Sequence, residues 1–238
     1  MKKSYFNNFR TVSIIIPALN EELGIQKTIS MIPIKELLKA GYKTEVIVVD
    51  NNSTDNTVMI AKNMQVKVLF EEKQGYGWAY MRGFSGAIGQ IIVAADADCT
   101  YPLNQLPDLL RIYENKKLRF LTTNRFSSGY VHLDTMSLLS KVGNYILSGI
   151  FRIIYFVDIN DSQSGMWIVN RKLLNRMKLR GRQMNFSQEI KIEAIHYLKT
   201  RWDEIDIKYS ERLGSSKLSY IKNGIENFIF LFEKRLRR

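Results

Sequence analysis

One stretch of the chain, residues 90–102, constrains the fold more than any other. It reads Gln-Ile-Ile-Val-Ala-Ala-Asp-Ala-Asp-Cys-Thr-Tyr-Pro, an apolar run of mostly β-branched or small residues that ends in Asp96 and Asp98. An apolar run of this length beside turn residues is typical of a buried strand in a parallel sheet. In open α/β sheets, ligands bind beyond the carboxyl ends of such strands. The sequence therefore predicts two carboxylates at a ligand-binding edge.

Asp96 and Asp98 are separated by one alanine, and two carboxylates this close repel each other unless a cation lies between them. The favoured cation is a hard divalent ion, Mg²⁺ or Mn²⁺, which prefers oxygen ligands and often bridges to substrate phosphates. The alternative is an ordinary strand-to-helix turn in which one aspartate caps the next helix. This stretch alone does not distinguish the two interpretations.

Three further segments repeat the pattern of a strand followed by a polar loop. Residues 12–18 and 45–50 are apolar runs, the second ending in an aspartate, and residues 66–70 precede a glycine-containing turn at 74–77. Helical patterns follow these loops, so the chain reads as consecutive strand–loop–helix units with right-handed crossovers. We expect an α/β fold with a single Rossmann-like, mostly parallel central sheet and helices on both faces.

Composition narrows the class of protein. The chain has 238 residues, 45% of them hydrophobic, and a formal net charge of +12. This charge favours an anionic partner, which could be nucleotide phosphates, nucleic acid or an anionic membrane surface. No run of about 18 apolar residues appears, so we expect no transmembrane helix. A single cysteine and the lack of a signal peptide favour the cytoplasm.

Two segments have strongly apolar helical patterns. Residues 135–156 are apolar over most of the predicted helix surface, and the segment 218–238 carries apolar residues on one face and ends in basic residues. A buried core helix is the ordinary interpretation of 135–156, and a helix lying in a membrane interface is the alternative. Neither pattern indicates an oligomeric state.

The order of these signals resembles family 2 glycosyltransferases with the GT-A fold, over roughly residues 11–224. The resemblance rests on Val-Ser-Ile-Ile-Ile-Pro-Ala-x-Asn-Glu-Glu at 12–22, on Asp-Ala-Asp followed by Tyr-Pro at 96–102, and on Arg-x-Gly-x-Ser-Lys at 212–217. The last two features are similar to the polyprenyl-phosphate branch, the dolichol-phosphate mannose or glucose synthase-like enzymes. The resemblance implies a GT-A catalytic domain at 1–217, followed by an amphipathic basic helix at 218–238 that is not a separate domain.

The resemblance also implies roles for individual residues. The nucleotide sugar would be bound by Pro17, Ala18, Asn20, Glu21, Asp50, Asn52, Gly75, Asp96 and Ala97. Asp96 and Asp98 would hold the metal, and Thr100 stands where some relatives place a metal-ligating glutamine. Phosphates of the donor or acceptor would be held by Arg125, Arg212, Ser216 and Lys217. The implied catalytic residues are Asp98, Arg125, Asp161 and Glu189, the last two as bases or acceptor-orienting groups.

Two of these residues have simpler interpretations on their own. Asn20 is a plausible N-cap for the first helix, because asparagine is favoured at that position. Asp50 could bind the ribose or base of a nucleotide, or it could only brace the turn that follows its strand.

Chemistry separates two classes of acceptor. A sugar hydroxyl needs a carboxylate base within reach, whereas a phosphate monoester, with a second pKa of about 6, is already largely ionised and needs cations. The surplus of Arg and Lys favours the second class. We expect an inverting, metal-dependent transfer of a hexose from UDP-glucose or GDP-mannose to polyprenyl or dolichyl phosphate at the cytoplasmic membrane face.

Peripheral membrane contact would come from 135–156 and 218–238, because many members of this branch continue into transmembrane helices that lie beyond the present chain. One alternative is transfer to a hydroxyl of a glycan or a lipid-linked oligosaccharide. A remote alternative is a basic nucleic-acid-binding protein, but no signature of that class appears, so we expect no nucleic-acid partner.

Overall fold

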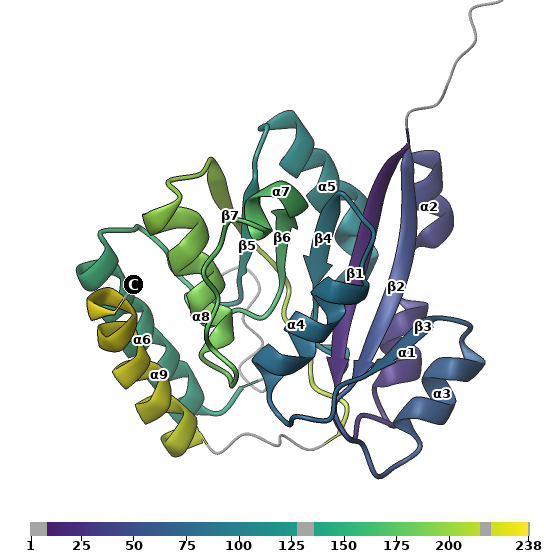
Figure 1. Cartoon of the computed structure of the whole chain (residues 1–238), viewed down its shortest axis with the longest axis horizontal. Helices are drawn as coiled ribbons and strands as arrows, with labels where there is room; N and C mark the ends of the chain where they lie inside the picture. The colour runs from purple at the N-terminus through teal and green to yellow at the C-terminus, as the bar shows by residue number, and fades with distance from the viewer. Residues whose placement is uncertain (1–8, 128–135, 215–219, 238) are drawn as a thin grey trace, which may run out of the picture.

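The computed structural model describes residues 9–127, 136–214 and 220–237 (Figure 1). In these residues a seven-stranded sheet has the order β3-β2-β1-β4-β6-β5-β7. Its strands are β1 (Arg10–Ala18), β2 (Tyr42–Asp50), β3 (Lys67–Phe70), β4 (Ile91–Ala94), β5 (Phe120–Asn124), β6 (Trp167–Asn170) and β7 (Trp202–Asp206). Only β6 runs antiparallel to its neighbours, β4 and β5, and every other pairing is parallel. The expected single, mostly parallel sheet is confirmed.

Helices cover both faces of this sheet. Alternate residues of the central strands enter two hydrophobic clusters, with Ile14 and Ile16 in one and Ile15 in the other. The first face is covered by α1 (Ile25–Ser30), α2 (Ile34–Lys39), α3 (Thr57–Asn63) and α5 (Leu106–Asn115), which a short 3₁₀ turn at Leu103–Gln105 precedes. The second is covered by α4 (Tyr76–Gly86), α6 (Leu138–Tyr155), α7 (Arg171–Leu174), α8 (Phe186–Lys191) with its π-helical continuation Ile192–Tyr197, and α9 (Tyr220–Leu236).

The reversed strand β6 explains how distant segments meet at one edge of the sheet. The carboxyl ends of β1, β2, β4 and β5 lie at the same edge, because β5 is reversed twice relative to β4. Trp167, the first residue of β6, pairs with Ala94 near the end of β4. The turn 161–165 before β6 therefore lies beside the residues that follow β4.

The first helix begins later than its sequence suggests. α1 starts at Ile25, and its N-cap position is Gly24. Asn20 instead has a positive φ of 53°, and its Oδ1 accepts a hydrogen bond from the Thr54 amide at 2.7 Å. The N-cap prediction for Asn20 is therefore wrong, because its side chain ties together the loops after β1 and β2.

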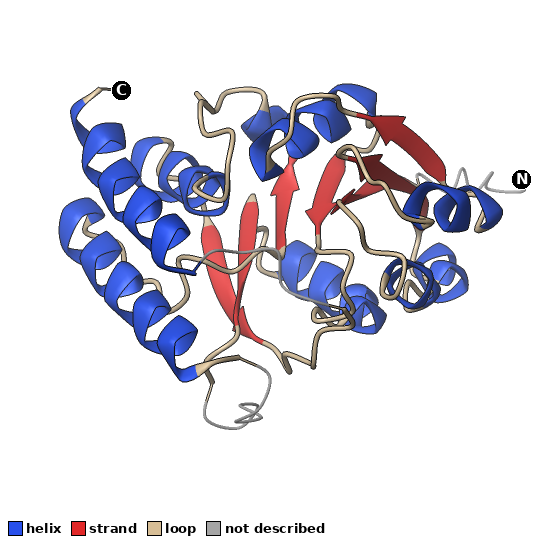
Figure 2. Ribbon diagram, turned by 90° about the horizontal axis from the view of Figure 1, so that it is seen from below, coloured by secondary structure: helices blue, strands red, loops and turns tan. Residues whose placement is uncertain are grey.

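α6 and α9 pack side by side at one end of the molecule, in both views (Figures 1 and 2). The inner sides of these helices are buried, and the Tyr155 hydroxyl of α6 donates to the Leu231 carbonyl of α9 at 2.6 Å. Their outer sides carry exposed large apolar side chains: Leu138, Leu139, Val142, Tyr145, Ile146 and Ile153 on α6, and Ile221, Ile225, Phe228, Ile229, Phe232 and Leu236 on α9.

The segment 135–156 is therefore amphipathic and not wholly a core helix. Residue 135, the first of this segment, lies outside the described part of the chain. Among the helices that the structure describes, none combines the length and apolar character needed to cross a bilayer.

Candidate active site

The carboxyl edge of the sheet opens into a cavity of about 910 Å³. Its walls come from the loops after β1, β2, β4 and β5, from α4, and from the facing sides of α6 and α9. Nine residues that the sequence singled out line it: Pro17, Ala18, Glu21, Gly75, Asp96, Ala97, Asp98, Arg125 and Arg212. The topology thus brings carboxylates, cations and a glycine turn from five parts of the chain to one cavity.

The two aspartates of the Asp-x-Asp motif have different partners. Asp96 Oδ1 accepts from the Tyr76 hydroxyl at 2.8 Å. Asp98 Oδ2 lies 2.6 Å from Arg212 Nη2, while its Oδ1 accepts from the amide and hydroxyl of Thr100 at 3.1 and 2.5 Å. Burial, followed by the charge of Asp98, raises the pKa of Asp96 to about 6. The pair therefore holds negative charge that its surroundings only partly offset.

This excess negative charge fits a divalent cation. The Thr100 hydroxyl donates to Asp98 and so braces the carboxylate that we expect to hold the metal. Within the described residues, no group of three or more His, Cys, Asp or Glu is arranged to hold a metal. Mg²⁺ or Mn²⁺ at Asp96 and Asp98 would thus complete its coordination with water and substrate phosphates, as Mg²⁺ commonly does.

Arg125 and Asp161 form a buried ion pair at the floor of the cavity. Asp161 accepts from Arg125 Nε at 2.6 Å and from Nη2 at 2.9 Å, and its side chain has no exposed surface. Burial lowers the pKa of Arg125, but the charge and hydrogen bonds of Asp161, together with Tyr101 and Tyr209, more than offset this. The pKa is therefore raised well above its ordinary value. Arg125 lines the cavity and Asp161 does not. The geometry thus makes Asp161 the counter-ion that orients Arg125.

The turn 161–165 packs directly against Asp96. A Cβ added to Gly165 would lie 2.8 Å from Tyr76 Oη and 3.0 Å from Asp96 Oδ2, so a larger residue would displace these two side chains. The Gly165 amide donates to the Tyr101 hydroxyl at 2.6 Å, and Lys191 Nζ donates to the Ser164 carbonyl at 2.6 Å. A buried lysine on α8 therefore fixes the turn that carries this glycine.

Glu189 lies away from the cavity. Its carboxylate is fully buried and accepts from the backbone amides of Arg180 at 2.9 Å and Gly181 at 2.7 Å. It also pairs with Lys234 of α9 at 2.8 Å. The structure therefore does not bring this predicted base to the cavity that holds the Asp-x-Asp motif.

Three residues predicted for nucleotide binding do not line the cavity: Asn20, Asp50 and Asn52. Asp50 is buried, and its Oδ1 accepts from the Ser53 amide at 3.2 Å, which is the turn-bracing contact considered above. The predicted phosphate-binding residues Ser216 and Lys217 lie outside the described residues.

Sequence reasoning passed over several residues that do line the cavity. Asn51 links two loops, since its Oδ1 accepts from the Gly75 amide at 2.8 Å and its Nδ2 donates to the Lys73 carbonyl at 2.8 Å. Tyr209 adds an aromatic face, with the Arg125 guanidinium 5.4 Å from its ring centre. Asn51 directly follows Asp50 at the end of a strand, and this placement is the sequence feature that could have predicted its position at the cavity.

Comparison with known proteins identifies the family. Residues 13–177 match the sequence profile of glycosyl transferase family 2. The chain belongs to this family. The glycosyltransferase is 30% identical over 222 residues to the low-salt glycan biosynthesis hexosyltransferase Agl6 of Haloferax volcanii, covering 93% of this chain and 53% of that protein. It is 28% identical over 217 residues to the dolichyl-phosphate hexose transferase of the same organism, covering 91% of this chain and 90% of that protein.

The glycosyltransferase spans about half the length of Agl6 and of the dolichol-phosphate mannosyltransferase of Pyrococcus furiosus, to which it is 28% identical over 77% of its own length. Among solved structures it is similar to glucosyl-3-phosphoglycerate synthase of Mycobacterium tuberculosis, in complex with Mn²⁺, UDP and phosphoglyceric acid. The TM-score is 0.72 at 20% identity, covering 95% of this chain and 78% of that one. This likeness supports the GT-A-like fold expected from the sequence.

Proposed function

We propose that this glycosyltransferase moves a hexose from a nucleotide sugar, UDP-glucose or GDP-mannose, to a polyprenyl or dolichyl phosphate. A relative named dolichyl-phosphate hexose transferase aligns with nearly the whole chain and supports this class of acceptor. A single displacement of the nucleoside diphosphate by the acceptor phosphate inverts the anomeric centre.

The observation that carries the proposal is how the carboxylates in and beside the cavity are paired. Among the described residues that line the cavity, the carboxylates are Glu21, Asp96 and Asp98. We assign the last two to the metal, and Glu21 Oε1 approaches Arg212 Nη1 at 3.9 Å. Both oxygens of Asp161 accept from Arg125. With Asp96 and Asp98 assigned to the metal and Asp161 held by Arg125, the arrangement favours an acceptor that is already ionised over a sugar hydroxyl that needs a base.

Cations complete the arrangement. Arg125 and Arg212 both line the cavity and both have pKa values raised by neighbouring carboxylates despite burial, so they stay charged at any physiological pH. Fork-shaped guanidinium groups suit phosphate oxygens. We assign them to the phosphates of donor and acceptor. Mg²⁺ or Mn²⁺ at Asp96 and Asp98 would offset the charge of the departing nucleoside diphosphate.

We also propose that α6 and α9 make a peripheral membrane contact. Both helices carry exposed apolar side chains, and residues of both line the cavity, among them Leu139, Asn144, Ile225 and Asn227. Such helices bury their apolar sides in the interface of a bilayer, where a lipid-linked phosphate is also held. Arg235, exposed in the last turn of α9, fits an anionic leaflet on the cytoplasmic side.

A transfer assay tests the proposal. The protein is incubated with labelled UDP-glucose or GDP-mannose, Mg²⁺ and a short polyprenyl phosphate. The matched control is the same polyprenol without its phosphate, and a glycan acceptor forms a third arm. We expect label on the polyprenyl phosphate only. Label on the polyprenol or the glycan, with none on the lipid phosphate, would refute the proposed acceptor.

A further inference from the structure

We propose that α9 is part of the donor site, and that Glu189 and Lys234 are positioning residues for the glycine turn 75–77. The inference rests on the proposed function only in taking this cavity as the nucleotide-sugar site. Glu189 then acts through the backbone and does not touch the substrate. The contacts that connect α9 to the glycine turn form three steps.

The first step joins α9 to two buried glutamates. The Lys234 side chain is 5% exposed, and Nζ lies 2.8 Å from Glu189 Oε1 and 2.8 Å from Glu193 Oε1. It also donates to the Lys178 carbonyl at 2.6 Å. The contacts with Glu189 and with the Lys178 carbonyl are hydrogen bonds, and the contact with Glu193 is an ion pair. Both glutamates are fully buried, and Lys234 is paired with each of them.

The second step joins Glu189 to the turn 178–182. One of its oxygens, Oε2, accepts from the Gly181 amide at 2.7 Å, and both oxygens lie 2.9 Å from the Arg180 amide. A Cβ added to Gly181 would lie 3.0 Å from Glu189 Oε2. The carboxylate therefore holds this turn by its backbone at close range, with Lys234 on its other side.

The third step joins the turn 178–182 to the cavity wall. The Arg182 carbonyl accepts from the Gly77 amide at 3.0 Å. A Cβ added to Gly75 would lie 2.3 Å from the Arg182 carbonyl oxygen. A Cβ added to Gly77 would lie 2.5 Å from the Gly181 carbonyl oxygen. The two turns thus pack backbone against backbone, and a shift of one displaces the other. Tyr76 lies between the two glycines and donates to Asp96.

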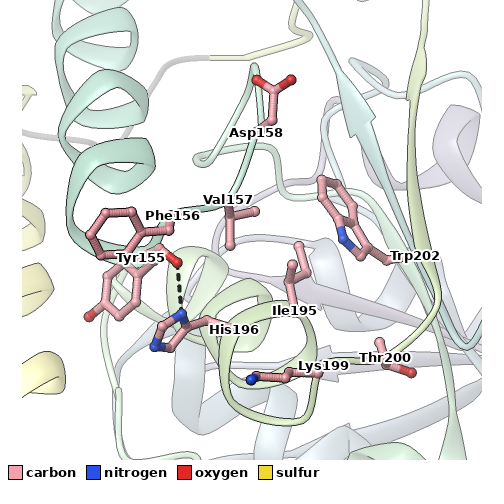
Figure 3. Close-up of a pocket in the computed structure, with 9 residues that line it drawn as sticks. All are labelled: Tyr155, Phe156, Val157, Asp158, Ile195, His196, Lys199, Thr200 and Trp202. Atoms are coloured by element: carbon pink, nitrogen blue, oxygen red, sulfur yellow. Dashed lines mark hydrogen bonds between the residues drawn. The ribbon is translucent and has the colours of Figure 1, made fainter.

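Contacts other than those from Lys234 to the glycine turn also hold α9 in place. Leu231 is fully buried and its carbonyl accepts from the Tyr155 hydroxyl. Arg235 Nη1 donates to His196 Nε2 at 2.8 Å, so the His196 Nδ1–H donates to the Tyr155 carbonyl at 2.7 Å. Figure 3 shows this second bond at the wall of a separate pocket between α6 and β7. A substitution of Lys234 therefore tests the link to the glycine turn while α9 stays docked.

Glu193 provides a matched control. It is as buried as Glu189 and pairs with the same Lys234 at the same distance, but its other oxygen accepts from the Lys178 amide at 3.1 Å. Of the two glutamates, Glu189 is the one that accepts from the Gly181 amide. If the cluster were merely structural, loss of either glutamate would have the same effect on donor binding.

The experiment compares Glu189→Gln, Glu193→Gln and Lys234→Met for the affinity of UDP and GDP with Mg²⁺, measured by calorimetry, and for donor KM and kcat. We expect Glu189→Gln and Lys234→Met to weaken nucleotide binding and raise donor KM about tenfold or more, with a smaller change in kcat, because they misplace the glycine turn. Glu193→Gln should change either value less than twofold. The double variant of Glu189 and Lys234 should be no worse than Lys234→Met alone.

Two further readouts separate positioning from stability. The Lys73 ammonium and the Arg182 guanidinium both lie over the Trp78 ring, each 4.6 Å from a ring centre. Its emission, obtained by difference against Trp78→Phe, should change in Glu189→Gln and not in Glu193→Gln. Lys234→Arg, which keeps the charge, should keep the wild-type nucleotide affinity.

Equal loss of nucleotide affinity in both glutamine variants, or wild-type affinity in Glu189→Gln, would overturn the inference. Nucleotide affinity is measured without acceptor. A wild-type protein that binds nucleotide but fails to glycosylate polyprenyl phosphate would therefore refute the proposed function and leave this test intact.

Discussion

Lys191 gives a quantitative test of how the floor of the site is built. Its side chain is fully buried, and Nζ donates to the carbonyls of Ser164 at 2.6 Å and Ser187 at 3.0 Å. Burial lowers the pKa of Lys191 from its ordinary value of 10.5 to about 7, although nearby carboxylates, with Asp161 first, act in the opposite direction. A neutral amine still has two N–H donors, which match the two carbonyls.

The sign of the effect on stability follows from this lowered pKa. Between pH 7 and 10.5 the unfolded chain binds more protons at Lys191 than the folded protein does, so the free energy of unfolding rises with pH in this window. Each pKa unit corresponds to about 1.36 kcal/mol. From pH 7.5 to 9.0, this residue alone should therefore add about 2 kcal/mol to the free energy of unfolding.

Urea unfolding of the wild type and Lys191→Met at pH 7.5 and 9.0 measures this contribution. We expect the wild type to gain about 2 kcal/mol more than the variant over the interval, by the same linkage. Lys172→Met, which removes an exposed lysine of α7, is the control and should follow the wild type. Identical pH dependence in the wild type and Lys191→Met would refute the reasoning, since a titrating buried lysine could not then be present.

Three further outcomes follow from the site. Asp98→Ala should abolish sugar transfer, and substantial turnover with labelled donor would contradict a metal at the Asp-x-Asp motif. Gly165→Ala should weaken nucleotide binding by roughly tenfold or more, because its Cβ would press on the Asp96 carboxylate; unchanged affinity by calorimetry would show that the turn moves freely. Arg125→Met should lower the free energy of unfolding by about 3–5 kcal/mol, because Asp161 is left buried without its cation. A loss in urea titrations below about 1 kcal/mol, the value of an exposed pair, would contradict this.

Local patterns were enough to predict the sheet and the ends of its strands. The run at 90–102 predicted both β4 and the two aspartates that line the cavity, since strand ends in a parallel sheet share one edge. Arg125 and Arg212, which the family resemblance implied as phosphate-binding residues, also line the cavity. These features depend on residues adjacent in sequence, or on the topology that repeated units impose.

The partners of buried charges could not be predicted in the same way. Asp161 pairs with Arg125, 36 positions away, and Glu189 pairs with Lys234, 45 positions away. A candidate base and a buried counter-ion look alike in sequence, because both are carboxylates after a polar turn or in a first helical turn. Only the packing decides which cations face them, and packing depends on the whole fold.

The final helix shows the same limit. Its pattern of apolar and basic residues suggests a surface element that could be removed with little effect on the fold. The structure instead buries Leu231 and Lys234 against the second face of the sheet. Removing α9 would leave two fully buried glutamates without their cation, so the fold itself should be weakened. A lysine in a basic tail carries no local sign that it is the buried one.

The two sides of α9 have a thermodynamic consequence. One side presents exposed apolar residues and the other carries Lys234, which connects through Glu189 to the glycine turn of the cavity. If a bilayer binds the first side and thereby shifts α9, its effect on nucleotide affinity must be matched by an equal effect of the nucleotide on bilayer affinity. A loaded donor site would then select between membrane-bound and free protein. Measuring the affinity of the protein for liposomes with and without UDP tests directly whether the two effects are equal.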